Sequence, residues 1–134
     1  MFFGSHEHVL DDKGRTSLPK DFRQLLKQQK ADPWLTAGAH CLAIYTADEF
    51  DRIKAKLTEN ALPDGEIIRQ QRRILGNATR CRVDAQGRIL VPQTLRRYAR
   101  LQRDIVFAGL GTLIEVWDRS LWKAEMDRAR AESE

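Results

Sequence analysis

The stretch that decides the fold occurs twice in the chain. Residues 11–23 read DDKGRTSLPKDFR, and residues 84–96 read DAQGRILVPQTLR. Aligned at a constant offset of 73, the two stretches share Asp, Gly, Arg, Pro and Arg at the same five places. The apolar pattern continues past them, because LAIY at 42–45 matches IEVW at 114–117 at an offset of 72. We infer that the chain of 134 residues duplicates one unit of roughly 70 residues.

Each copy predicts the same local structure. Asp11 and Asp84 are predicted to form tight turns, in which the carboxylate bonds to nearby backbone and the following glycine supplies a positive φ. Short strands are expected before the turns, at 7–11 and 80–84, and after them, at 15–18 and 88–91. The apolar run of Ile89, Leu90 and Val91 predicts a buried strand. The proline of each copy then opens a helix.

Further elements follow in both copies. Strand pairs are predicted at 34–37 with 41–46 and at 105–108 with 113–118. A closing helix follows each pair, capped by a Thr46-x-x-Glu49 box in the first copy and by Asp118 in the second. A linker at 60–65 leads to a third helix at 66–75, which has an apolar side and a basic side and ends at Gly76.

These elements predict an α+β fold of two units that share one core. A unit of this size buries little on its own, so the two should pack about a pseudo-two-fold axis, with their strands forming one barrel or sandwich. We expect the first unit at 1–59, a linker and connecting helix at 60–76, the second unit at 77–122, and a helix end with a fraying tail at 123–134.

Charge is concentrated in the second half of the chain. The net charge is +4, but residues 69–103 hold ten arginines, no lysine and one acid, which makes this segment +9 and the remainder −5. Such an arginine field on a small protein points to a polyanionic partner, and nucleic acid is the first candidate.

Arginine also follows the glycine of each predicted turn, as Arg15 and Arg88, with Lys13 and Gln86 just before that glycine. A guanidinium is a planar fork of donors that suits a phosphate or the O6/N7 edge of guanine. Because Gly-Arg is repeated, we interpret the two loops as neighbouring contacts on a duplex. The alternative is that the arginines only bond back to the aspartates of the turns.

At this point the chain resembles the MraZ family. The resemblance is carried by Met1-Phe2-x-Gly4, by the two D-x-x-G-R stretches with their prolines, and by Ile114-Glu115-x-Trp117, and it spans residues 1 to about 122. MraZ proteins are bacterial transcriptional regulators built from two SpoVT-AbrB-like domains. The resemblance implies a swapped-hairpin or double-split β-α-β barrel with peripheral helices.

The resemblance also implies a partner and a site. It implies binding of double-stranded DNA at direct repeats in promoters of the division and cell wall gene cluster, by a ring-like homo-oligomer in the cytoplasm and at the nucleoid. It further implies no enzymatic activity, cofactor, membrane contact or small-molecule substrate. The predicted DNA-binding residues are Lys13, Gly14, Arg15, Gln86, Gly87 and Arg88. Independently of the resemblance, the arginine-rich segment offers candidate phosphate contacts at Arg69, Arg72, Arg73, Arg80 and Arg82, and the first three of these could instead pair with acids of a neighbouring subunit.

The sequence leaves two alternative functions open. One is a self-assembling or protein-binding module, an antitoxin-like AbrB relative whose arginines grip an acidic partner. The other is a small nuclease or hydrolase that uses Asp11, Asp12, His6 and His8, but the sequence offers no convergent set of metal ligands. We expect the two histidines to lie on a strand surface or a subunit contact, and Cys41 and Cys81 to pack as small apolar residues.

Overall fold

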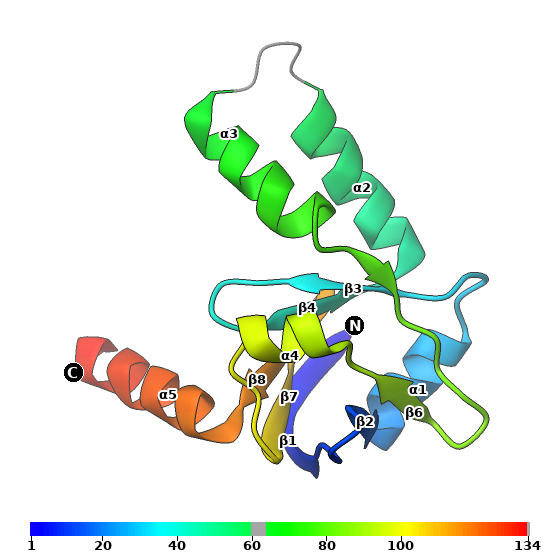
Figure 1. Ribbon diagram of the computed structural model, residues 1–134, viewed down its shortest axis with the longest axis vertical. Coiled ribbons are helices and arrows are strands. Elements are labelled where there is room, and N and C mark those ends of the chain that lie inside the picture. Colours follow the sequence, from blue (N-terminus) through cyan, green and yellow to red (C-terminus); the bar gives the residue numbers. More distant parts are fainter. Residues whose placement is uncertain (60–63, 134) are drawn as a thin grey trace.

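The computed structural model describes residues 1–59 and 64–133, and it confirms an α+β fold. An antiparallel six-stranded sheet has the order β1-β7-β8-β4-β3-β5, and a separate two-stranded ribbon pairs β2 with β6 (Figure 1). The strands are β1 (Phe2–Val9), β2 (Arg15–Ser17), β3 (Trp34–Ala37), β4 (Leu42–Tyr45), β5 (Thr79–Arg80), β6 (Arg88–Leu90), β7 (Asp104–Gly111) and β8 (Leu113–Asp118). The helices are α1 (Lys20–Lys27), α2 (Ala47–Thr58), α3 (Gly65–Gln70), the π-helical turn η1 (Gln71–Leu75), α4 (Gln93–Tyr98) and α5 (Arg119–Ser133).

The two repeats are interlocked. Strand β1 of the first repeat pairs with β7 of the second, and β5 of the second pairs with β3 of the first. The ribbon also takes one strand from each repeat. The six-stranded sheet is open, with β1 and β5 at its edges, and the ribbon covers part of the core.

A single core joins the repeats. Phe22 from α1 and Leu95 from α4 pack in one buried cluster with Ile89 of the ribbon and with Leu35 and Phe107 of the sheet. A smaller cluster on the far side of β7 and β8 holds Cys41, Val106 and Trp117 against α5. Helices α2 and α3 stand side by side and project from this body, and α5 extends from it in another direction (Figure 1).

Strand ends differ from prediction where the partner strand comes from the other repeat. Strand β1 covers Phe2–Val9 instead of 7–11, because it pairs along its whole length with β7, which is itself longer than the predicted 105–108. Strand β5 covers only Thr79–Arg80 instead of 80–84, and the chain then leaves the sheet toward the second turn.

Leu90 is a second correction. The apolar run predicted a buried strand, yet Leu90 is 57% exposed while its neighbours Ile89 and Val91 are buried. In a ribbon with one face on the core, successive side chains alternate between the core and solvent, so the middle residue of the run faces outward.

The helix caps lie where the sequence predicts them. The Glu49 N–H donates to Thr46 Oγ1 at 3.2 Å, and the Ser120 N–H donates to Asp118 Oδ2 at 3.1 Å. The predicted helix at 66–75 is α3 followed by the turn η1. Helix α5 continues to Ser133. Residues 60–63 of the predicted linker lie outside the described residues.

Candidate nucleic-acid interface

The two turns have the same hydrogen bonds. Asp11 Oδ1 accepts from the backbone N–H of Lys13 at 2.9 Å and of Arg15 at 2.8 Å. Asp84 Oδ1 accepts from the backbone N–H of Gln86 and of Arg88, both at 2.9 Å. In each turn the aspartate therefore holds the backbone on both sides of the glycine.

Each arginine also bonds to its aspartate. Arg15 Nε donates to Asp11 Oδ2 at 2.9 Å, and Arg88 Nε donates to Asp84 Oδ2 at 3.1 Å. The arginine side chains remain 43% and 41% exposed, and within the described parts of the chain their terminal nitrogens have no hydrogen-bond partner. The aspartate thus orients the guanidinium through Nε and leaves the outer edge of the fork available.

Both aspartates are held in the charged form. The pKa of Asp11 lies below its ordinary value, chiefly because its carboxylate accepts the backbone N–H of Arg15. The backbone N–H of Arg88 lowers the pKa of Asp84 in the same way. A charged carboxylate is the form that accepts all three bonds, so the loop geometry holds at neutral pH.

The glycines shape the loops but do not offer surface to a partner. Gly14 and Gly87 have φ of +85° and +78°, which a residue with a Cβ rarely adopts. Both are buried, because an arginine of the other repeat covers each of them: Arg96 lies over Gly14 and Arg23 lies over Gly87. The side chains beside them, Lys13 and Gln86, are exposed.

Arg23 and Arg96 have a structural role that the sequence did not predict. Arg23 Nη2 donates to the carbonyl of Ala85 at 3.1 Å, and Arg96 Nη1 donates to the carbonyl of Asp12 at 3.3 Å. Each therefore ties the helix of one repeat to the turn of the other. The sequence does mark these two arginines, because they occupy the last of the five positions at which the two copies are identical.

The β2–β6 ribbon brings Arg15 and Arg88 onto one face. Arg15 lies opposite Leu90 and Ser17 lies opposite Arg88, while the central pair, Thr16 and Ile89, is buried. Arg15 and Arg88 are thus diagonal neighbours, for which the usual spacing is about 7–8 Å. That spacing corresponds to about two base-pair steps along a duplex.

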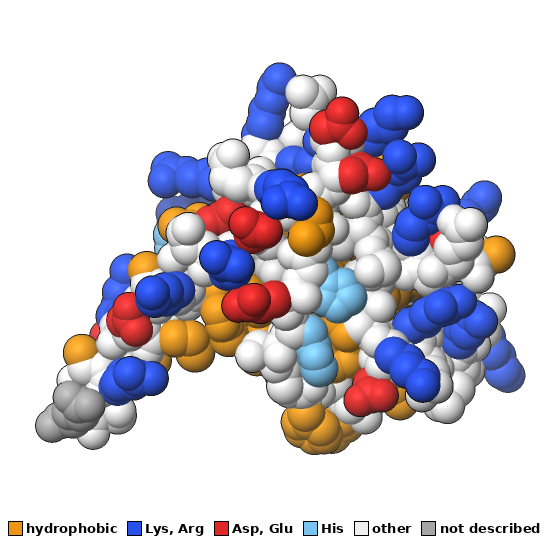
Figure 2. Space-filling view, turned by 90° about the horizontal axis from the view of Figure 1, so that it is seen from below, with side chains coloured by type: hydrophobic (Ala, Val, Ile, Leu, Met, Phe, Trp, Pro, Cys, Tyr) orange, Lys and Arg blue, Asp and Glu red, His pale blue; other side chains and the backbone are white. Residues whose placement is uncertain are grey.

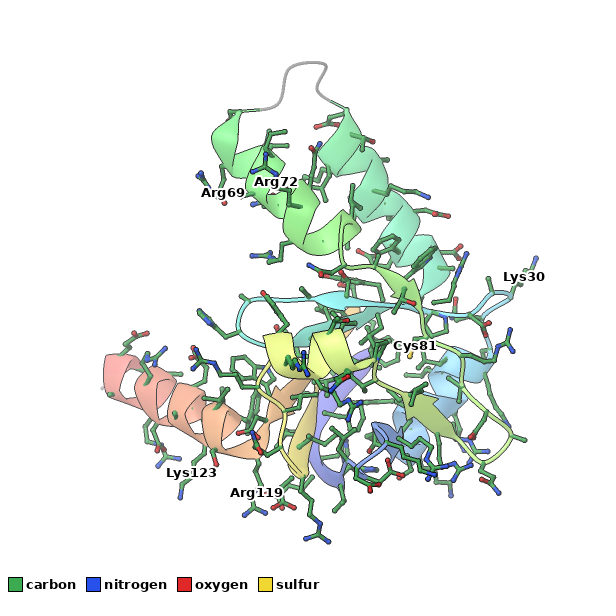
Figure 3. The ribbon with its side chains drawn as sticks, viewed as in Figure 1. Lys30, Arg69, Arg72, Cys81, Arg119 and Lys123 are labelled. Carbon is green, nitrogen blue, oxygen red and sulfur yellow. The ribbon has the colours of Figure 1, made fainter. Side chains whose placement is uncertain are left out.

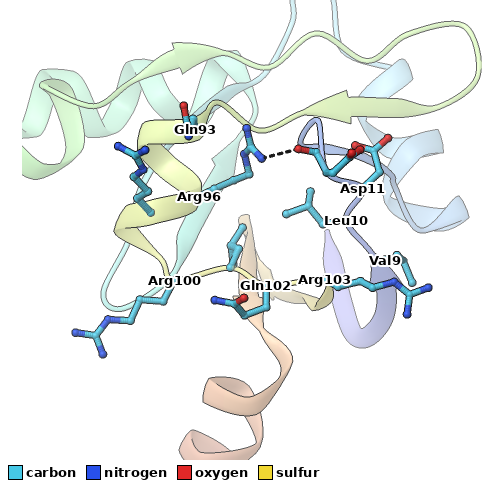
Figure 4. Close-up of a pocket in the computed structure, with 11 residues that line it drawn as sticks. Val9, Leu10, Asp11, Gln93, Arg96, Arg100, Gln102 and Arg103 are labelled. Carbon is cyan, nitrogen blue, oxygen red and sulfur yellow. Dashed lines mark hydrogen bonds between the residues drawn. The ribbon is translucent and has the colours of Figure 1, made fainter.

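An open basic groove of about 970 Å³ runs beside the first turn. Its lining includes Asp11, Arg96, Arg97, Arg100 and Arg103. Arg96 points across the groove toward the turn, whereas Arg100 points away from it (Figure 4). Lys and Arg side chains also gather on the side of the molecule where α1, β2 and β6 lie (Figure 2).

Three of the other candidate arginines lie away from this ribbon or are engaged within the fold. Arg69 and Arg72 lie on the helical arm at the opposite end of the molecule (Figure 3), and Arg69 pairs with Glu66 at 3.0 Å. Arg73 is half-buried. Arg80 is stacked 4.1 Å from the centre of the Trp34 ring and donates to the Asp32 carbonyl at 2.6 Å, so it is engaged within the fold. Arg82 is exposed.

The two histidines of the hydrolase alternative pack against aromatic rings of the core. His6 packs edge-on against Phe22 and His8 against Phe107, with ring centres 5.1 and 5.4 Å apart. Within residues 1–59 and 64–133, no group of three or more His, Cys, Asp or Glu side chains is placed to hold a metal ion. None of the helices described has the length and apolar character needed to cross a membrane.

The cysteines are buried and free of disulfides. Burial raises the pKa of the Cys81 thiol to about 12 and also raises that of Cys41. Both thiols are therefore protonated at neutral pH and pack as small apolar groups, as predicted.

The sequence of this chain is similar to those of known proteins over most of its length. Residues 1–72 and 74–134 match the model of the family described as "MraZ protein, putative antitoxin-like". A protein named transcriptional regulator MraZ from Caldanaerobacter subterraneus is 37% identical over 92% of this chain and 85% of its own length. Proteins of the same name from Acetivibrio thermocellus and Methylococcus capsulatus are 38% and 37% identical, over 92% and 98% of this chain and 85% and 86% of their own lengths.

Proposed function

The chain belongs to the MraZ family, and we propose that it is a transcriptional regulator that binds specific double-stranded DNA through the outward face of the β2–β6 ribbon. The observation that carries the proposal is that Arg15 and Arg88, one from each repeat, stand on this one face with the outer edges of their guanidinium groups available. A two-stranded ribbon fits the major groove of B-DNA, where arginine reads guanine.

The finer parts of the proposal come from the resemblance. The target is a set of direct repeats in the promoter of the division and cell wall gene cluster, and the effect there is repression. Lys13 and Gln86 assist from the exposed turns beside the arginines. Arg97, Arg100 and Arg103 add attraction to phosphates along the groove, which lies beside the first turn.

Self-association is part of the same proposal. Strand β1 is an edge of the sheet, and Met1, Phe3 and Leu110 are exposed by half or more beside one another at its start. An exposed apolar strand edge readily pairs with another chain. We propose that a second copy covers this edge in a ring-like homo-oligomer, whose mass light scattering of the purified protein will measure.

The proposal is tested with DNA from just upstream of the protein's own gene. Binding is measured by fluorescence anisotropy across a salt series for the wild type, Arg15→Ala, Arg88→Ala and the double variant. Each single substitution should weaken binding by about 5- to 150-fold, because a bidentate contact to guanine contributes about 1–3 kcal/mol. The double variant should lose the preference for the upstream DNA altogether.

A matched control is Arg128→Ala. Arg128 is an exposed arginine that pairs with Glu125 at 2.9 Å on α5, away from the ribbon. It should bind as the wild type does. Undiminished binding by the double Arg15/Arg88 variant would refute the site. Equal wild-type affinity for upstream and random DNA would refute the regulator, and capture of an acidic protein by the same arginines would favour the antitoxin-like alternative.

A further inference from the structure

The outward face of the ribbon carries an apolar side chain among its charges. Leu90 is 57% exposed, although its side chain lies on the same face as Arg15, directly across the ladder. Single exposed leucines are common on protein surfaces and need no explanation by themselves. Here, however, the leucine lies within the four-residue face that the proposed function assigns to DNA.

The duplication shows what is unusual about this position. At the offset of 73, Thr16 corresponds to Ile89, and these two residues pair with each other, so the pseudo-two-fold axis passes through them. Ser17 then corresponds to Leu90. Each lies opposite the arginine of the other repeat, so Arg15 faces Leu90 while Arg88 faces Ser17. Both halves of the ribbon therefore carry an arginine, but the residue opposite that arginine is leucine in one half and serine in the other.

The two neighbours have different chemistry. The Ser17 hydroxyl lies 3.2 Å from His8 Nδ1, so it already has a partner within the protein. Leu90 has only an apolar surface to offer. In the major groove the apolar feature of a base edge is the C5-methyl group of thymine, and water is released when the two meet.

We propose that Leu90 is a specificity-determining residue that contacts a thymine methyl beside the base read by Arg15, and that the Arg88 half makes no such contact. The inference rests on the proposed DNA-binding function and deepens it. The Arg15–Leu90 side of the ribbon and the Arg88–Ser17 side would then recognise different bases. One chain would therefore bind each DNA repeat in a single orientation.

The test removes the methyl group alone. The upstream fragment is amplified with dUTP in place of dTTP, which replaces every thymine by uracil, and its affinity is compared with that of the ordinary fragment. Wild-type protein should bind the uracil fragment about three- to fivefold more weakly for each thymine contacted. Leu90→Ser should bind the ordinary fragment more weakly and should bind both fragments equally.

The control variant is Met126→Ser, which changes an exposed apolar residue on α5, away from the ribbon. It should keep the wild-type ratio between the two fragments, and thermal unfolding followed by circular dichroism shows whether each variant is folded. If Leu90→Ser keeps the wild-type ratio, the difference comes from the DNA itself and the inference is wrong. It is also wrong if wild-type protein binds both fragments equally while still requiring Arg15 and Arg88. Failure of the wild type to prefer the upstream fragment over random DNA refutes the proposed function instead.

Discussion

At the scale of single residues, the two turns show why glycine is required where the copies share it. A Cβ on Gly14 would lie 2.5 Å from the carbonyl oxygen of Val91. This oxygen belongs to the backbone, so it cannot move aside without distorting the chain. A Cβ on Gly87 would meet the Arg23 side chain at 2.6 Å, and a flexible side chain can move. The same motif position therefore tolerates change differently in the two repeats.

We expect Gly87→Ala to lower the free energy of unfolding by about 1–2 kcal/mol, the usual cost of a left-handed conformation in a residue with a side chain. Gly14→Ala should lower it further, because the clash with Val91 adds to the strain. Urea denaturation measures both. Gly65→Ala is the control, since Gly65 has no positive φ and its nearest neighbour to a Cβ is 3.5 Å away. Equal effects at Gly14 and Gly87 would contradict the prediction.

At the scale of elements, the sequence predicted what is local. The strands at 34–37 and 113–118 agree with β3 and β8, and the Thr46 cap is where its pattern placed it. Each of these depends on residues close together in the chain. Strand β1 was predicted poorly because its length is set by β7, about a hundred residues away, and no local pattern reports that partner.

The same distinction applies to the site. The motif predicted the turns and both arginines, because D-x-x-G-R is a local signal that occurs twice. It did not predict that Leu90 faces outward, which depends on which side of the ribbon covers the core. Nor did it predict the roles of Arg23 and Arg96, which contact the turn of the other repeat.

Those cross-repeat contacts make a prediction at this scale. Arg23→Ala should loosen the turn at 84–88 and leave the turn at 11–15 unchanged, because Arg23 bonds to Ala85. Arg96→Ala should have the converse effect. Hydrogen exchange followed by mass spectrometry should show several-fold faster exchange in the affected turn, as expected for the loss of one hydrogen bond to a charged group. Faster exchange confined to the turn of the substituted repeat would show that the contacts do not couple the repeats.

At the scale of the whole molecule, the two repeats form a single structure. At two places a residue pairs across the strands with the residue that occupies the same position in the other repeat. Ala43 pairs with Glu115 at the repeat offset of 72, and Thr16 pairs with Ile89 at the offset of 73. The pseudo-two-fold axis thus passes through the middle of the large sheet and through the middle of the ribbon. Every pairing between β1 and β7, β3 and β5, or β2 and β6 joins one repeat to the other.

Interlocking of this kind means that neither half can fold by itself. Among the residues that the structure describes, cutting the chain after Gly76 leaves the first fragment with only the β3–β4 pair and the second with only the β7–β8 pair. A two-stranded pair is marginally stable at best in water, and each fragment would also lack half of the shared core. Circular dichroism should therefore show both fragments unfolded when separate. Mixing them at equal concentration should restore the β-sheet signal and a cooperative thermal transition like that of the intact chain. A cooperative transition from either fragment as a monomer would show that the repeats are independent domains, and the ribbon arginines could then no longer be held together by the fold of one chain.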